Sequence, residues 1–161
     1  MNDIDIPLIP VLLQMEDHGV RISSGQFETV QADLEAGIRD IEYAMTLETG
    51  VRINMNSPQQ ISWLLFEHLG FTPLGKTRSK TSYSTDISVL ERLAKLENGT
   101  VPRLLLEYRE LSKMLSGFVI PLQKAAGSEG IIHTTFEPAM TGTGRLSSRD
   151  PNLQNIPVFG K

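Results

Sequence analysis

The first third of the chain carries the spacing of a long amphipathic helix. Apolar side chains recur at intervals of three and four residues, at Phe27, Val30, Leu34, Ile38, Ile41 and Met45. This spacing places them on one face of an α-helix. Ser23 and Ser24 are both suitable N-caps, and Gly50 supplies a C-terminal stop. The sequence therefore predicts a helix between those serines and Gly50.

A second helix is predicted after residue 57. Ser57 can cap it, Pro58 suits the first helical position, and Gln60 stands three residues after the cap, as in a capping box. Four apolar residues form its inward face, Ile61, Leu64, Leu65 and Leu69. Gly70 ends the pattern, so we expect a shorter helix over this range.

Residues 72–86 break the helical pattern. They contain Pro, Gly and hydroxyl residues without apolar periodicity, which predicts a polar and basic loop. A short helix is expected from about Ile87 to Leu96, capped by Thr85 or Asp86.

A longer helix is predicted from Thr100, with Pro102 in its first turn. Its apolar positions are Leu104, Leu105, Tyr108, Leu111, Leu115, Phe118, Val119 and Leu122. Pro121 is expected to kink or limit this helix, because a proline has no N–H to donate.

The pattern changes from helical to extended after Gly130. Residues 131–136 are mostly β-branched or aromatic, which predicts a strand, and residues 138–161 are rich in Gly, Ser, Thr, Asn and Pro. The predicted fold is mainly α, with a short β-and-loop segment at its C-terminal end.

Composition limits the functional classes. Of 161 residues, 40% are hydrophobic, which suffices for one sizeable core, and the absence of cysteine excludes disulfides and thiolate chemistry. No apolar run approaches the ~18 residues of a membrane span, and the acidic start is unlike a secretory signal. We therefore expect no membrane partner and a cytoplasmic location.

Charge is unevenly distributed along the chain. The net charge is −4, yet residues 1–75 hold three basic and eleven acidic side chains, whereas residues 76–161 hold twelve basic and eight acidic ones. The second half thus carries +4 while the first carries −8. This asymmetry suggests that one part of the molecule faces an anion, and a chance difference between solvated surfaces is the alternative.

Candidates for catalysis are sparse. Transfer of a phosphoryl or nucleotidyl group usually needs carboxylates that hold a pair of divalent ions, and no such pair is evident. Glu137 and Asp150 are the only acidic residues after Glu129, and Asp150 precedes Pro151, where a turn-forming role is natural. Residues 142–144 lack the Lys-Ser/Thr ending of a P-loop. The sequence favours binding over catalysis.

Two groups of basic and hydroxyl side chains suit a phosphodiester backbone. One lies in the loop over 76–85, and the other follows one helical face, where Arg109 and Lys113 are four residues apart and Ser112 and Ser116 repeat the same interval. A solvated loop and an ordinary exposed helix face are the alternatives.

A third group lies in residues 141–157, where amides and donors crowd together and apolar residues are few. Arg145, Asn152, Gln154 and Asn155 have the donors to meet acceptors in a DNA minor groove. Because those acceptors are nearly the same for every base pair, such contacts can test duplex shape without reading sequence.

The same stretch resembles a known protein family. Thr143-Gly-Arg-Leu-Ser-Ser148 and Asp150-Pro-Asn-Leu-Gln-Asn-Ile-Pro157 are similar to the signature that opens the palm of family A DNA polymerases, the bacterial DNA polymerase I type. Residues 105–113 resemble the family's long thumb helix, residues 54–57 the turn before a shorter one, and residues 7–23 the segment leading into the thumb. The resemblance covers nearly the whole chain.

This resemblance implies a helical thumb subdomain over residues 23–130, after a leading segment over 1–22 and before the β-hairpin and loop of an incomplete palm over 131–161. The implied partners are a primer-template DNA duplex, bound without sequence specificity, and the rest of the polymerase, its palm and fingers. The implied DNA-binding residues are Asn56, Ser57, Lys76, Thr77, Ser84, Thr85, Arg109, Lys113, Ser116, Arg145, Ser147, Ser148, Asn152, Gln154 and Asn155.

The sequence departs from the family pattern in places. Glu137-Pro138 stands where many members have Asn-Gln, Gly117-Phe118 stands where Thr-Tyr is usual, and the loop over 76–85 lacks a frequent glycine. Polar contacts at Glu137 should therefore differ from those of other members.

The resemblance also places the family's metal-binding aspartates and fingers helix after Lys161. No cofactor is therefore expected in this chain, with Mg²⁺ expected for the complete polymerase, and the chain alone is expected to be inactive. Two alternatives remain: a non-enzymatic protein-interaction module derived from a polymerase, and a free-standing phosphotransfer enzyme using Glu137 and Asp150.

Overall fold

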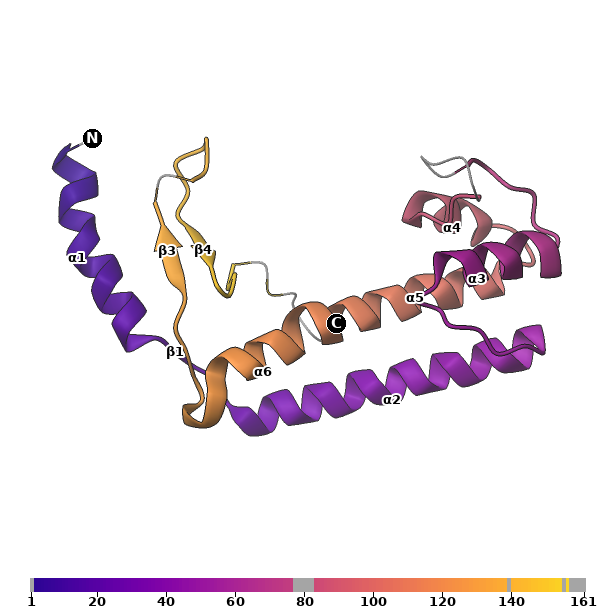
Figure 1. Cartoon of the computed structure of the whole chain (residues 1–161), viewed down its shortest axis with the longest axis horizontal. Helices are drawn as coiled ribbons and strands as arrows, with labels where there is room; N and C mark the ends of the chain where they lie inside the picture. The colour runs from indigo at the N-terminus through magenta and orange to yellow at the C-terminus, as the bar shows by residue number, and fades with distance from the viewer. Residues whose placement is uncertain (1, 77–82, 139, 155, 157–161) are drawn as a thin grey trace. The chain divides into compact units, whose positions relative to one another are not determined.

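A computed structural model describes residues 2–76, 83–138, 140–154 and 156 (Figure 1). The fold is mainly helical, as predicted. Its elements are α1 (Asn2–His18), β1 (Val20–Arg21), α2 (Ser24–Thr49), α3 (Pro58–Ser62), η1 (Trp63–His68), α4 (Ile87–Leu93), α5 (Thr100–Met114), η2 (Leu115–Val119), α6 (Ile120–Ala126), η3 (Gly127–Glu129), β2 (Ile131–Ile132), β3 (Thr135–Glu137) and β4 (Ser147–Arg149).

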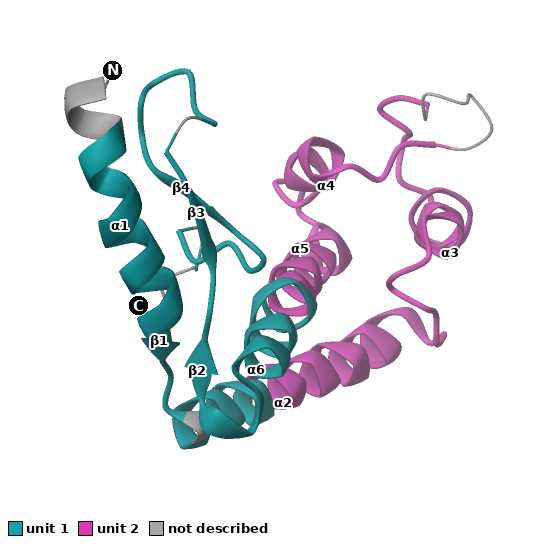
Figure 2. Ribbon diagram, turned by 60° about the vertical axis from the view of Figure 1, so that its left-hand side comes forward, with its two compact units in different colours: residues 1–33, 114–161 teal, residues 34–113 magenta. Residues whose placement is uncertain are grey.

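The chain forms two compact units (Figure 2). One consists of residues 34–113, and the other of residues 1–33 with 114–161. The long helix α2 contributes to both, since the division falls at its residue 33. The subdomain boundaries implied by the resemblance, at residues 22 and 130, stay predictions.

The unit of residues 34–113 has a leucine-rich core. Leu64 and Leu65 from η1, Leu90 from α4 and Leu105 from α5 are all fully buried, and Ile41 and Met45 come from α2. The apolar faces predicted from helical spacing thus meet in one cluster. Burying each such side chain contributes roughly 1.5–3 kcal/mol, so this cluster is the main source of the unit's stability.

The start of α3 confirms Ser57 as an N-cap. The Gln60 N–H donates to Ser57 Oγ at 3.4 Å. The expected reciprocal bond is different: Gln60 Oε1 accepts from the Asn54 N–H at 2.7 Å, while the Ser57 N–H donates to the Asn54 carbonyl. The glutamine therefore secures the turn before the helix instead of the capping residue itself.

The long C-terminal helix does not end at Pro121. Residues 115–119 form a π-helical stretch, in which the Ile120 N–H donates to the Leu115 carbonyl, and α6 then continues to Ala126 with Pro121 in its first turn. The helical path therefore continues past Pro121, although the ring nitrogen has no hydrogen to donate. The short helix α4 also ends earlier than expected, at Leu93.

The other unit contains two small antiparallel sheets. Strand β1 pairs with β2, with Val20 opposite Ile132, and β3 pairs with β4, with Phe136 opposite Ser148. The single strand predicted over 131–136 is divided in two, because Thr134 turns its hydroxyl to the carbonyls of Arg149 and Pro151.

Helix α1 lies beside β3 in Figures 1 and 2. Glu16 joins the two, because its carbonyl bonds to His133 Nδ1 at 2.8 Å and its carboxylate accepts from the Phe136 N–H at 2.6 Å. Buried Leu122, Ala126 and Ile132 form this unit's small core. Within the described ranges, no helix is long and apolar enough to cross a membrane.

Candidate nucleic-acid interface

The polar loop after residue 72 begins and returns through paired backbone. Lys76 and Tyr83 form an isolated antiparallel bridge, and the Ser84 N–H donates to the Gly75 carbonyl at 3.0 Å. The Tyr83 ring meets Phe66 edge-on, with centroids 5.3 Å apart. This pairing defines the base of the loop and leaves Lys76 exposed. Thr77 lies outside the described residues.

Ser84 and Thr85 face inward at this loop base. They are only 7% and 6% exposed. Ser84 Oγ donates to Asp86 Oδ2 at 2.7 Å and accepts from the Asp86 N–H. In this arrangement both hydroxyls serve the structure of the loop, and their predicted role as phosphate contacts stays a prediction.

Arg109 is the inner cation of the site. Its Nη1 donates to the Thr85 carbonyl at 2.7 Å, and its Nη2 lies 3.5 Å from Thr85 Oγ1. Burial lowers the pKa of Arg109, and the negative charge of Asp86 partly offsets that effect. The guanidinium nevertheless remains a cation at neutral pH, as arginine does in proteins.

Lys113 lies one helical turn after Arg109 and is exposed. Its ammonium is therefore presented to solvent by a regular helix, α5. Ser116, the third member of the predicted stripe, is exposed and belongs to the other compact unit.

Asn56 is held from the side by the core. Its Nδ2 donates to the Tyr108 hydroxyl at 3.0 Å, while the asparagine itself is exposed and Tyr108 is only 5% exposed. A buried tyrosine thus places an exposed amide immediately before the Ser57 cap. The structure therefore presents one of the two predicted donors at this turn and uses the other as a helix cap.

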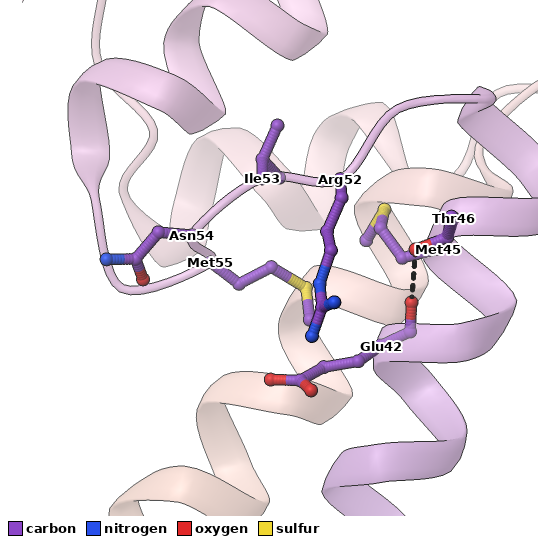
Figure 3. Close-up of a pocket in the computed structure, with 7 residues that line it drawn as sticks. All are labelled: Glu42, Met45, Thr46, Arg52, Ile53, Asn54 and Met55. Atoms are coloured by element: carbon purple, nitrogen blue, oxygen red, sulfur yellow. Dashed lines mark hydrogen bonds between the residues drawn. The ribbon is translucent and has the colours of Figure 1, made fainter.

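A pocket of about 400 Å³ lies behind this turn (Figure 3). Thr46 Oγ1 donates to the Glu42 carbonyl at 2.9 Å, and the side chains of Arg52 and Glu42 point toward each other. The pocket is lined by Glu42, Met45, Thr46, Arg52, Ile53, Asn54 and Met55. The mixed charges give this pocket no clear preference for an anion.

The hairpin of β3 and β4 carries the remaining candidates in the other unit. Arg145 is exposed in the connecting loop, where its carbonyl accepts from Thr141 Oγ1 at 2.6 Å. Ser147 Oγ donates to the Glu137 carbonyl. Ser148 is 4% exposed, and its Oγ accepts from the Leu153 N–H at 3.0 Å. Of these three predicted contacts, only Arg145 is exposed.

The segment after β4 folds back on the hairpin through amide side chains. Asn152 Oδ1 accepts from the Gln154 N–H at 2.9 Å, and Gln154 Nε2 donates to the Leu146 carbonyl at 2.6 Å. Both side chains belong to exposed residues. Asn155 lies outside the described residues.

The two carboxylates considered for catalysis both meet Arg149, a residue that the sequence analysis did not select. Arg149 Nε pairs with Glu137 Oε1, and Arg149 Nη1 lies 3.6 Å from Asp150 Oδ2. Arg149 therefore lies beside both carboxylates and partly offsets their negative charge. Among the described residues, no three His, Asp or Glu side chains gather as a metal site.

Comparison with known proteins decides the family. The sequence model described as DNA polymerase family A matches residues 24–161. The chain belongs to this family. The family A chain is 41% identical over 158 residues to DNA polymerase I of Lactococcus lactis subsp. cremoris and 42% identical over 159 residues to that of Streptococcus pneumoniae serotype 4. Each alignment covers 98% of the chain and 18% of the relative.

The fold of this family A chain has a close counterpart of known structure. That structure is the POL domain of Pol1 from M. smegmatis in complex with DNA primer-template and dNTP, with a TM-score of 0.82 and 34% sequence identity. The match covers 98% of this chain and 27% of that one. The chain therefore spans about a fifth to a quarter of the proteins it resembles.

Proposed function

We propose that this chain binds a primer-template DNA duplex through its sugar-phosphate backbone and minor groove, as the thumb and first palm edge of a family A polymerase. The observation that carries the proposal is its similarity, over 98% of its length, to a polymerase domain whose structure contains primer-template DNA. Binding of this kind does not depend on base sequence.

Exposure divides the proposed contacts into two sets. The exposed candidates are Asn56, Lys76, Lys113, Ser116, Arg145, Asn152 and Gln154. These side chains offer cations and neutral donors, which suit phosphate oxygens and minor-groove acceptors. Ser57, Ser84, Thr85, Ser147 and Ser148 bond within the chain, so they shape the backbone that presents the first set.

The exposed face of α1 supports a second partner, the rest of the polymerase. Ile6, Ile9 and Leu13 are 59%, 52% and 58% exposed and recur at helical spacing. Apolar side chains gathered in this way usually mark a contact surface. Nucleotidyl transfer and its Mg²⁺ requirement would then belong to the complete polymerase, and we assign neither to this chain.

The test of duplex binding is a salt titration. A fluorescently labelled primer-template duplex is mixed with the chain, and anisotropy is followed as NaCl is raised. Neutralising about four phosphates gives a log–log slope near −4. A duplex of unrelated sequence should give the same curve. Absence of binding even at low salt would remove the proposal for this chain.

A further inference from the structure

We propose that Arg109 is a positioning residue for the base of the loop over residues 76–85 and is not itself a phosphate contact. It holds Thr85 and, through the returning segment 83–86, fixes the place of Lys76. The inference rests on the proposed function in one respect, because Lys76 serves duplex binding only if the chain binds a duplex.

The first step is the bond from α5 to the loop base. Arg109 Nη1 lies 2.7 Å from the Thr85 carbonyl oxygen, within the range of a charge-assisted hydrogen bond. The second contact, 3.5 Å from Nη2 to Thr85 Oγ1, is longer and weaker. Thr85 is 6% exposed, so water competes little for this carbonyl. The Arg109 side chain thus ties Thr85, two residues before the start of α4, to α5.

The second step runs from Thr85 to Lys76 along the backbone. Next to Thr85, the Ser84 N–H donates to the Gly75 carbonyl at 3.0 Å, and the adjoining pair is the bridge of Tyr83 with Lys76. Ser84 Oγ also bonds to Asp86 Oδ2, which stiffens the segment before α4. Displacing Thr85 would therefore displace the strand that Lys76 pairs with.

The third step concerns where the cationic charge of Arg109 is directed. Its guanidinium is half-buried and donates to Thr85, and the nearby negative charge of Asp86 partly balances its positive charge. Lys113, one turn along the same helix, is exposed. A phosphate could use only the N–H groups of Arg109 that Thr85 leaves available, on a guanidinium that is already half-buried. Of the two cations, Lys113 is suited to the phosphate and Arg109 to the loop.

The decisive variant is Arg109→Lys, and its matched control is Arg103→Lys, because Arg103 also lies on α5 and its Nη1 donates to a backbone carbonyl, that of Ala94, at 2.7 Å. Both keep the charge, yet a lysine cannot reproduce the planar fork of a guanidinium. Amide hydrogen exchange at Ser84 is measured without DNA, and duplex affinity is measured by anisotropy. We expect Arg109→Lys to speed Ser84 exchange and weaken binding, each by about tenfold, as loss of one charge-assisted hydrogen bond predicts. Arg103→Lys should change neither, because the side-chain hydrogen bonds of Arg103 lie outside the segment 83–86 and Arg103 is not among the proposed DNA contacts.

A double-mutant cycle covers the case in which Arg109→Lys destabilises the whole unit. Because Arg109 acts through Lys76, the affinity losses of Arg109→Lys and Lys76→Gln should be less than additive, whereas those of Lys113→Gln and Lys76→Gln should add. Wild-type exchange and affinity in Arg109→Lys, or additivity with Lys76→Gln, would overturn the inference. If the unaltered chain binds no duplex, the proposed function falls, and Ser84 exchange still decides the role of Arg109.

Discussion

At the scale of single residues, burial decides which polar side chains can meet a ligand. Ser84, Thr85 and Ser148 have hydroxyls that could donate to a phosphate oxygen. All three residues are under 10% exposed, however, and their hydroxyls are already bonded within the chain. Releasing such a group costs its internal hydrogen bond. Lys76 and Arg145 are exposed and require no such exchange.

Tyr108 is a residue whose buried ring serves an exposed neighbour. Replacing it in Tyr108→Phe removes the hydroxyl that accepts from Asn56 Nδ2 at 3.0 Å and leaves the ring in place. We expect the free energy of unfolding to fall by about 1 kcal/mol, the usual contribution of one hydrogen bond. Urea denaturation followed by the fluorescence of Trp63, the single tryptophan, measures this change.

Tyr43→Phe is the matched control for that variant. Tyr43 is 67% exposed, so its hydroxyl is available to water and its removal should change stability by less than about 0.5 kcal/mol. Equal losses in the two variants would show that the bond to Asn56 contributes nothing specific.

Glu137 shows how a departure from the family pattern is accommodated. On the surface that we propose for DNA, an isolated carboxylate would repel phosphate, whereas Glu137 is paired with Arg149 on the neighbouring strand. The guanidinium of Arg149 offsets the charge of Glu137, and Asp150 lies 3.6 Å from the same guanidinium. Such a partly exposed pair contributes at most about 1 kcal/mol to stability, so its main effect is electrostatic.

At the scale of elements, Gly19 sets the connection between α1 and β1. Its φ of +68° lies in the left-handed region, and an added Cβ would come within 2.5 Å of the Ile131 side chain and 3.0 Å of the Ile132 carbonyl oxygen. Gly19→Ala should therefore lower the free energy of unfolding by more than about 1 kcal/mol. Thermal denaturation followed by circular dichroism measures the loss.

Gly25→Ala provides the matched comparison. Gly25 lies in the first turn of α2, and an added Cβ there meets nothing within 4 Å. Its stability should be unchanged or raised by up to about 1 kcal/mol, because alanine favours a helix. A similar loss in both variants would mean that the conformation of Gly19 is not the cause.

The helices could largely be predicted because their information is local. The spacing from Phe27 to Met45, with a stop at Gly50, describes α2 almost to its ends. The helix over residues 2–18 was not predicted as an element, since Pro7 and Pro10 lie inside it and proline usually interrupts helices. Strand β1 was also not predicted, because its two residues pair with β2 more than a hundred positions away.

The candidate site shows the same limit. Residue types at the loop and hairpin could be selected from sequence, but serines that are alike in sequence differ in burial, as Ser84 and Ser116 do. Arg149 was missed because its pairing with Glu137 depends on the register of β3 and β4. Side-chain exposure and strand register both follow from contacts between distant parts of the chain.

At the scale of the whole molecule, the division of charge along the chain leads to the last prediction. Residues 76–161 carry +4 and residues 1–75 carry −8. At 0.1 M salt the screening length is about 10 Å, so acidic side chains distant from the duplex should matter little to its binding.

Lys113→Gln and Arg145→Gln, each removing an exposed cation, should each reduce the salt slope of duplex binding by about 1. Glu48→Gln removes one exposed negative charge from the acidic half and should leave the slope unchanged. If Glu48→Gln changed the salt slope as much as Lys113→Gln, duplex binding would depend on the net charge of the chain. That result would argue against specific phosphate contacts at Lys113 and Arg145.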